Sequence, residues 1–364
     1  MEKIIYFNTD LQKELVRPLI IRLLKCLDLK RLINYMLIRF QHSLRMVRVF
    51  GYPYDVIIDP CNICMLHCPL CPTGLGETSR RKAIMKFELF KKIIDEIGDY
   101  VISVNFTNWG EPLLNRDLPK MVKYCKKVKL IPLVRFDTNL NVDLDEKFCD
   151  EILLSGLDIL SISIDGVSQK TYEVYRRNGD LAKVLRNIKL LVSRRKNLGL
   201  KKPYFIWQFL VFKHNIHEIP LAIRTAHEVG VDMIKIASGR VYMGDEAFRP
   251  IKELMQISKN ILVQPGSYWS LYTKDLKKRA RKRFCDWLWK RIVINPDGSV
   301  SPCCAYYPQK YDFGDIVHTS IKELWNSNKY KEARKSAKNR DHARRVREAI
   351  VCAICTLLGN FVDV

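Results

Sequence analysis

Three cysteines within eight residues are the part of this sequence best suited to chemistry. Cys64, Cys68 and Cys71 have the spacing C-x3-C-x2-C and follow the apolar run at 56–58. An iron–sulfur cube has four irons and therefore four positions for ligands. A compact loop with three cysteines leaves one iron without a protein ligand. Such an open iron can chelate a cofactor and pass it an electron.

Two other interpretations of these cysteines are open at this point. Zinc sites commonly pair two C-x2-C units, and His67 would serve as a fourth ligand only from a strained position between two cysteines. Free thiols pack as small hydrophobes, but four cysteines within eleven residues, counting Cys61, are too dense for that role. The spacing therefore favours an iron–sulfur cluster.

Length and composition are those of a globular protein with many cysteines. The chain has 364 residues, enough for one large domain and a smaller one, and 48% of them are hydrophobic. Its twelve cysteines are clustered, unlike a secreted disulfide framework, and no secretory signal is evident. We therefore expect a cytoplasmic location, with peripheral attachment to a membrane as the alternative.

The formal net charge of +23 is high for this length. Basic residues concentrate in the first 50 residues, at 274–283 and at 329–347. Such charge suits nucleic acid, an anionic membrane surface or an acidic substrate, although a solvated surface is its commonest use. The segment 329–347 has the pattern of an exposed helix, and no nucleic-acid partner is expected.

Residues 11–48 have the pattern of an amphipathic helix. Leucine recurs at 15, 19, 23 and 27, and the apolar spacing continues to Phe40. Arginines and lysines interrupt every long apolar run, so the segment lacks the roughly 18 uninterrupted apolar residues of a membrane span. A cationic amphipathic helix packs on its own protein or lies in a membrane interface, and both options are open.

From residue 53 to about 240 the sequence alternates between strand and helix. The expected strands are 54–59, 101–107, 130–137, 159–164, 204–212 and 233–236. The expected helices are 86–97, 118–127, 144–155, 171–198 and 218–229. Strict alternation implies a parallel sheet with right-handed crossovers. The fold class is therefore α/β, as a partial (β/α)6 TIM-like barrel or an open sheet, in which ligands collect at the carboxyl ends of the strands.

The chain divides into four segments on this pattern. An amphipathic helical extension at 1–50 precedes the α/β unit at 51–240, a basic helical linker at 241–284 and a small C-terminal domain at 285–364. In the last segment, Asn295-Pro-Asp-Gly298 lies between two β-prone runs and predicts a hairpin.

With these motifs in order, the chain resembles the radical S-adenosylmethionine (SAM) superfamily, and within it the proteins with a C-terminal SPASM or shorter twitch domain. The resemblance covers residues 53–355. It implies a SAM-binding [4Fe-4S] cluster on Cys64, Cys68 and Cys71, with Leu70 lining the adenine.

The resemblance also implies a SAM pocket. Trp109-Gly110-Glu111-Pro112 stands where the family has Gly-Gly-Glu-Pro, so Gly110 and Glu111 would hold the amino group while the bulky Trp109 departs from the pattern. The further matching positions are Thr138 and Asn139, with Leu140 in place of the family's glycine, Ser163 for the ribose and Arg176 for the SAM carboxylate.

A second cluster is implied in the C-terminal domain. Its ligands would be Cys285, Cys303, Cys352 and Cys355, as in a twitch-type domain with one fully ligated [4Fe-4S] auxiliary cluster. A zinc ribbon on the same four cysteines is the alternative. The neighbouring Cys304 is inert, replaces Cys303 as a ligand, or donates a hydrogen atom.

The resemblance implies an enzyme in which a 5′-deoxyadenosyl radical takes a hydrogen atom from substrate. With a redox-capable second cluster, the main expectation is an oxidoreductase performing a two-electron oxidation, with Asp165 or His214 as base. Epimerisation with thiol quenching and peptide modification are alternatives within the enzyme class, and a zinc- or RNA-binding protein is the alternative outside it. The expected partners are a flavodoxin- or ferredoxin-like reductant and a small-molecule, lipid-linked or peptide substrate.

Overall fold

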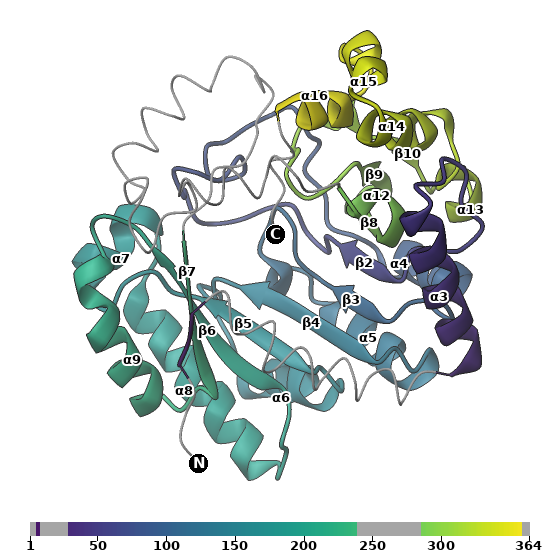
Figure 1. The fold of residues 1–364 in the computed structure, drawn as a ribbon. Helices are drawn as coiled ribbons and strands as arrows, with labels where there is room; N and C mark the ends of the chain where they lie inside the picture. The colour runs from purple at the N-terminus through teal and green to yellow at the C-terminus, as the bar shows by residue number, and fades with distance from the viewer. Residues whose placement is uncertain (1–4, 8–27, 239–284, 359–364) are drawn as a thin grey trace.

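The computed structural model describes residues 5–7, 28–238 and 285–358 (Figure 1). All strands of the described residues belong to one ten-stranded sheet, in the order β1-β7-β6-β5-β4-β3-β2-β8-β9-β10. The sheet is mixed but mostly parallel, and it is not closed into a barrel. The expected α/β class with an open parallel sheet is confirmed.

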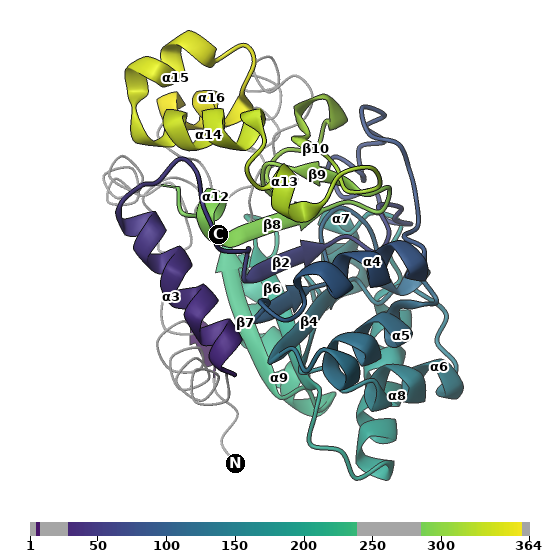
Figure 2. The ribbon, with the colours of Figure 1, turned by 90° about the vertical axis from the view of Figure 1, so that its right-hand side faces the viewer.

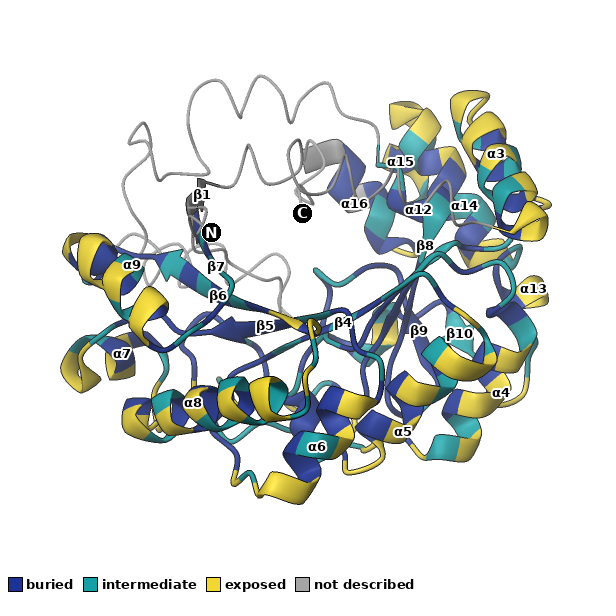
Figure 3. Cartoon of the chain, turned by 90° about the horizontal axis from the view of Figure 1, so that it is seen from below, coloured by how far each residue is buried: buried dark blue, intermediate teal, exposed yellow. Residues whose placement is uncertain are grey.

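Six parallel strands form the central part of the sheet, as the alternation predicts. They are β2 (Asp55–Ile58), β3 (Ser103–Asn105), β4 (Leu133–Thr138), β5 (Ile159–Ser163), β6 (Tyr204–Val211) and β7 (Met233–Ser238). The helices between them are α4 (Phe87–Ile97), α5 (Leu118–Lys123), α6 (Glu146–Leu154), α7 (Gln169–Tyr175), α8 (Leu181–Asn197) and α9 (Ile219–Glu228). Figure 3 shows α4, α5, α6 and α8 along one face of the sheet with their exposed sides outward.

The single helix predicted at 171–198 is wrong, because the structure has two helices there. α7 ends at Tyr175, and Asn178 adopts a left-handed conformation with φ of 65°. That backbone geometry cannot continue a right-handed helix. Asp180 then starts α8 by accepting a hydrogen bond from the Lys183 N–H, the usual role of an N-cap aspartate.

The N-terminal segment differs from a purely helical extension. A short strand, β1 (Ile5–Phe7), pairs in parallel with β7 at the sheet edge. The helix α3 spans Leu29–Ser43 and begins after the N-cap Asp28. The helix ends before the predicted 44–48, and residues 11–27 of the prediction and the whole predicted linker at 241–284 lie outside the described residues.

The predicted C-terminal hairpin is confirmed, and it extends the main sheet. β8 (Arg291–Ile294) pairs antiparallel with β9 (Ser299–Ser301), which pairs with β10 (Gly314–Asp315). The turn needs Gly298, whose φ is +88°. β8 also pairs in parallel with β2. The C-terminal domain is therefore continuous with the α/β unit through strand pairing.

Short helices surround this hairpin (Figure 2). They are α12 (Trp287–Lys290), α13 (Ile321–Leu324), α14 (Asn328–Lys338), α15 (Arg340–Val346) and α16 (Val351–Leu358). The basic segment at 329–347 thus lies on α14 and α15. No helix in the described ranges is long and apolar enough to cross a membrane.

A buried ion pair joins the loop after the first cysteines to the C-terminal domain. The Arg80 guanidinium donates to both oxygens of Asp312, at 2.6 and 2.8 Å, and to the carbonyl of Tyr307 at 2.7 Å. Both side chains are almost fully buried. Hydroxyls of Ser299 and Ser301 accept further bonds from Arg80. The charges are therefore well satisfied, as a buried pair requires.

Replacing Arg80 by methionine leaves Asp312 charged and buried without its partner. We expect Arg80→Met to lower the free energy of unfolding by about 3–5 kcal/mol, measured by urea denaturation. Arg81 is the matched control because it is adjacent and exposed, so Arg81→Met should change stability by no more than about 0.5 kcal/mol. Equal, small effects of the two variants would show that the pair does not join the two parts.

Candidate functional site

The three cysteines of the first motif converge in a loop at the carboxyl end of β2. Cys64, Cys68 and Cys71 pack in one cluster with Leu66, Leu70, Tyr175 and Phe212. Burial raises the pKa of Cys64 to about 12 and that of Cys68 to about 11. Thiolates in this loop therefore need a bound cation, and iron coordinates thiolate sulfur. The donor set fits an iron–sulfur cluster.

Cys61 differs from the three cysteines that follow it. It is fully buried, and its sulfur accepts a hydrogen bond from the Ile63 N–H at 3.4 Å. It also pairs with Ile84 in an isolated bridge that closes the loop. Cys61 therefore has a structural place in the loop, outside the cysteine cluster.

Gly110 lies where only glycine fits. A Cβ atom at this position would lie 1.9 Å from the Cys61 carbonyl oxygen. The next residue continues this close approach, because the Glu111 N–H donates to the Ile63 carbonyl at 2.9 Å. The glycine thus lets the motif after β3 pack against the cysteine loop.

The bulky Trp109 packs against the C-terminal domain. It is buried, and its ring meets Tyr307 of the C-terminal domain edge to face, with centroids 5.3 Å apart. The backbone N–H of Trp109 donates to the Asp59 carboxylate at 3.1 Å. Sequence reasoning missed Asp59, Arg80 and Tyr307. Only Asp59 had a signal in the sequence, because this carboxylate comes directly after the first apolar run.

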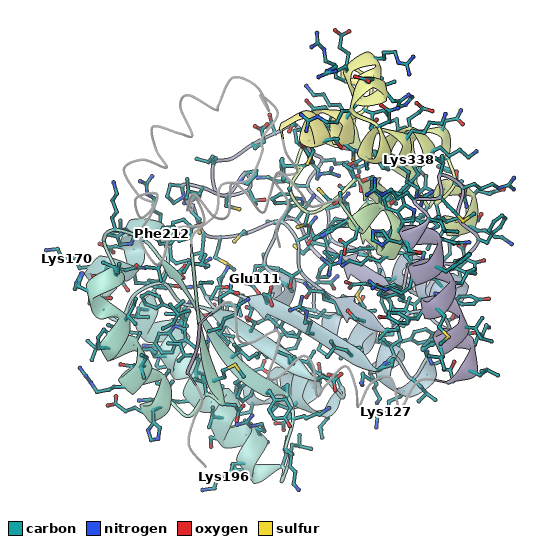
Figure 4. All side chains as sticks on the ribbon, viewed as in Figure 1. Glu111, Lys127, Lys170, Lys196, Phe212 and Lys338 are labelled. Carbon is teal, nitrogen blue, oxygen red and sulfur yellow. The ribbon has the colours of Figure 1, made fainter. Side chains whose placement is uncertain are left out.

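The buried carboxylate of Glu111 is the central polar group of the site (Figure 4). It accepts hydrogen bonds from the Thr138 hydroxyl at 2.6 Å, the Asn139 N–H at 2.7 Å and the Leu113 N–H at 3.1 Å. All three donors are neutral, and Glu111 forms no ion pair with any described residue. Burial raises its pKa to about 7. Arg176 acts on Glu111 only as a weak electrostatic influence without forming an ion pair. A buried carboxylate without an ion-pair partner fits the amino group of SAM.

Asn139 and Arg176 extend from this carboxylate to the cysteines. The Asn139 amide lies 3.4 Å from the Cys64 sulfur, and Arg176 Nη1 lies 3.9 Å from the Cys68 sulfur. Pro112 opens the 3-10 turn Pro112–Leu114 beside Glu111, and Ser163 ends β5 with its side chain mostly buried. The expected SAM-binding residues thus surround one edge of the sheet.

Asp165 is placed differently from a free base. It is fully buried, and it accepts from Arg176 Nε at 2.6 Å and from the Leu210 N–H at 2.6 Å. Burial raises its pKa, against the influence of Arg176. Both oxygens are occupied by protein donors, so this carboxylate orients the guanidinium of Arg176.

His214 is a titratable group that, unlike Asp165, makes no hydrogen bond to the described residues through its side chain. Its ring stacks on Phe212 with centroids 5.6 Å apart, and Phe212 packs on Tyr175 beside the cysteine loop. Both ring nitrogens are buried and have no hydrogen-bond partner among the described residues. Burial lowers its pKa, so the ring is neutral near pH 7.

The C-terminal cysteines form a second cluster against β2. Ile57 of β2 packs with a group of aromatic and cysteine side chains from α12 and the residues before it, the loop after β9, and α16. The cysteines in this group are Cys285, Cys303, Cys304, Cys352 and Cys355. Burial raises the pKa of Cys285 to about 12. Among the described residues, no three His, Cys, Asp or Glu side chains are placed to hold a single metal ion.

Comparisons with known proteins agree with this site. Residues 58–200 match the model of the radical SAM superfamily, and residues 285–356 match that of an iron–sulfur cluster-binding SPASM domain. Together the two models cover more than half of the chain. This chain therefore belongs to the radical SAM superfamily. It carries a C-terminal SPASM domain, and its cofactors are SAM, a [4Fe-4S] cluster and auxiliary iron–sulfur.

Several curated proteins are similar over about three quarters of the chain. A tungsten-containing aldehyde ferredoxin oxidoreductase cofactor-modifying protein of Pyrococcus furiosus is 27% identical, over 79% of this chain and 84% of its own length. A PqqA peptide cyclase of Granulibacter bethesdensis is 24% identical, over 75% and 74%. The antilisterial bacteriocin subtilosin biosynthesis protein AlbA of Bacillus subtilis is 27% identical over 73%, but only 57% of its length is spanned.

A solved structure supports the fold. The structure of Streptococcus suis SuiB bound to the precursor peptide SuiA has a TM-score of 0.56 and 13% identity, covering 80% of this chain and 69% of SuiB. At this identity the likeness concerns the fold alone.

Substitution of single cysteines separates ligands from structural thiols. We expect Cys64→Ala to abolish 5′-deoxyadenosine formation, because the cube loses one of its three protein ligands. Cys61→Ala is the matched control and should retain it. The measurement is chromatography of 5′-deoxyadenosine after anaerobic reduction with SAM. Normal product formation by Cys64→Ala would rule out the first motif as the ligand set.

The raised pKa of Glu111 predicts a pH-dependent affinity for SAM. Below about pH 7 the carboxyl is protonated and binding of the ammonium must release that proton, so affinity should fall by up to about tenfold per pH unit. Above about pH 8 the α-amino group loses its own proton. Calorimetry on the reconstituted protein should therefore find maximal affinity between these values.

The variant Glu111→Gln tests the same carboxylate. We expect it to weaken SAM binding by about 10- to 100-fold, because a charged hydrogen bond is lost, and to remove the fall on the acid side. Glu88→Gln, at an exposed position of α4, is the control. Unchanged affinity in Glu111→Gln would place the amino group elsewhere.

Proposed function

We propose that this chain is a radical SAM enzyme that modifies a peptide, removing two hydrogens and joining two positions of it. The observation that carries the proposal is the set of relatives matching about three quarters of the chain, which include PqqA peptide cyclases and a bacteriocin biosynthesis protein. These relatives favour peptide modification over the dehydrogenase-like oxidation of an unspecified substrate that was the main sequence-based expectation.

We assign the first cluster to Cys64, Cys68 and Cys71 and the auxiliary one to the C-terminal cysteines. The amino group of SAM would bind Glu111, its carboxylate Arg176 and its ribose Ser163. When bound, SAM and the first cluster supply a radical that takes a hydrogen atom from substrate. A flavodoxin- or ferredoxin-like reductant in a reducing, cytoplasmic setting completes the proposal.

The face of the sheet opposite the helix-side core supports binding of a polar, extended substrate. Along β4, Val134 and Phe136 point into the helix-side core, so Arg135 and Asp137 point to the opposite face. On the neighbouring strands Ser161, Gln208 and Lys235 continue this face, with Lys235 Nζ 3.3 Å from Gln208 Oε1. Such a polar row can hydrogen-bond a peptide backbone as well as its side chains.

Joining two peptide positions and dehydrogenating an alcohol remove the same two electrons and two protons. An auxiliary cluster suits either reaction as an electron acceptor. We propose His214 as the group that takes a proton, because its ring is neutral and its nitrogens are unoccupied. Asp165 is better suited to orienting Arg176, since both of its oxygens already accept protein hydrogen bonds.

A small-molecule reaction is the second candidate. The similarity to a cofactor-modifying protein of Pyrococcus furiosus favours it. Cys304, half-exposed beside the auxiliary cysteines, would serve as hydrogen donor only in an epimerase. The two candidates differ in which substrate couples to SAM cleavage.

The test is an anaerobic assay with the reconstituted enzyme, SAM, a reductant and a deuterated synthetic peptide library. We expect deuterium in 5′-deoxyadenosine and a peptide that is lighter by two hydrogens in mass spectrometry. Cys352→Ala should still form 5′-deoxyadenosine but give little cross-linked peptide. Deuterium transfer only from small molecules, with every peptide unchanged, would contradict the proposal.

A further inference from the structure

The helix α3 presents an apolar face to the outside of the molecule. Leu29, Ile33, Met36, Phe40 and Leu44 are between 55% and 71% exposed. Their spacing places them on one side of a helix with 3.6 residues per turn. Scattered exposed apolar residues are common, but a contiguous stripe of this size marks an interaction surface.

The opposite face of α3 is polar and fixed to the protein. The Arg31 guanidinium donates to the carbonyls of Val101 at 2.8 Å, Gly98 at 2.9 Å and Lys129 at 2.5 Å. Asn34 exchanges two hydrogen bonds with the backbone of Tyr52. Rotating α3 to bury its apolar stripe would break these buried bonds. The outward orientation is therefore built into the fold.

Further exposed apolar side chains continue the stripe at both ends. Val128 and Leu130 flank Lys129, whose carbonyl accepts from Arg31, and they are 57% and 68% exposed. Phe50 lies beyond the C-terminal end of the helix and is 64% exposed. We call this set, from Val128 and Leu130 along α3 to Phe50, the α3 surface.

The charges around the α3 surface are mainly positive. Arg39, Arg48 and Lys127 are exposed beside it, and Figure 4 labels Lys127. The acidic residues at the start of α3 are engaged by cations: Asp28 pairs with Arg31, and Asp99 pairs with Lys30 at 2.8 Å. The sequence ahead of α3 repeats the combination of leucine with arginine. Apolar side chains framed by cations suit an anionic lipid surface.

We propose that the α3 surface docks on an anionic membrane, with its apolar side chains in the interface and its cations at the headgroups. A protein partner or a second copy would account for the apolar stripe, but the surrounding cations favour anionic lipid. The segment after α3 is attached to the C-terminal domain. Trp289 Nε1 donates to the Met46 carbonyl at 2.8 Å, and the Asn326 side chain exchanges two hydrogen bonds with the Val49 backbone. Docking would therefore fix the orientation of the whole catalytic sheet.

The test is sedimentation of the full-length protein with phosphatidylcholine vesicles, with and without about one-third phosphatidylglycerol, at low salt. We expect binding only to the anionic vesicles and its loss toward about 1 M salt, where charges are screened. The double variant Ile33→Ser with Phe40→Ser should bind at least about tenfold more weakly. Leu154→Ser on α6 is the control, because Leu154 is 55% exposed.

A charge variant tests the cations independently. Arg39→Glu with Arg48→Glu should weaken binding by about tenfold or more, since each basic residue near such a surface contributes about 1 kcal/mol. Lys170→Glu with Lys196→Glu, at exposed positions away from α3 (Figure 4), should not weaken it comparably.

Three results would overturn the proposal. They are no sedimentation of the wild type at low salt, equal losses in the α3 and control variants, and a dimer in light scattering that dissociates in Ile33→Ser with Phe40→Ser. The last result would assign the α3 surface to a second copy. Because the readout is binding, failure of the membrane proposal leaves the proposed peptide chemistry untouched.

Discussion

The site is organised around the three hydrogen bonds that the buried carboxylate of Glu111 accepts. Its three neutral donors come from the turn after β3 and from the end of β4. It therefore ties two strand ends to the cysteine loop, which the Glu111 N–H contacts through the Ile63 carbonyl. Burial without a protein cation is unfavourable for a carboxylate, and a bound ammonium resolves it. Under the assignment proposed above, the cofactor offsets the cost of burying this carboxylate.

The two cysteine sets are held on one sheet by ordered contacts. β8 pairs with β2, the buried Arg80–Asp312 pair joins the loop to the hairpin, and Trp109 packs on Tyr307. Each contact links a segment next to the first cysteines with one next to the second. The distance between the sets is therefore fixed by the main core rather than by a linker. Such rigid placement is what radical chemistry needs from its protein.

Much of the fold and of the site was predictable from the sequence. Alternating apolar runs and helical periodicity identify β2 to β7, and the motifs from Cys64 to Arg176 lie together because parallel strands end at one edge. Other features depend on tertiary contacts. The break after Tyr175 needs the left-handed Asn178, the pairing of β8 with β2 is long-range, and periodicity alone cannot reveal that α3 turns its apolar side outward. Likewise, only packing shows that Asp165 is occupied by Arg176.

The most direct test of this account is electron–nuclear double resonance on the reduced protein with SAM labelled by ¹⁵N at its amino group. If the three-cysteine loop leaves one iron open and Glu111 holds the amino group beside it, the label couples to the cluster spin. That coupling should persist in Cys61→Ala. A reduced cluster that shows no coupling to bound, labelled SAM would contradict the account.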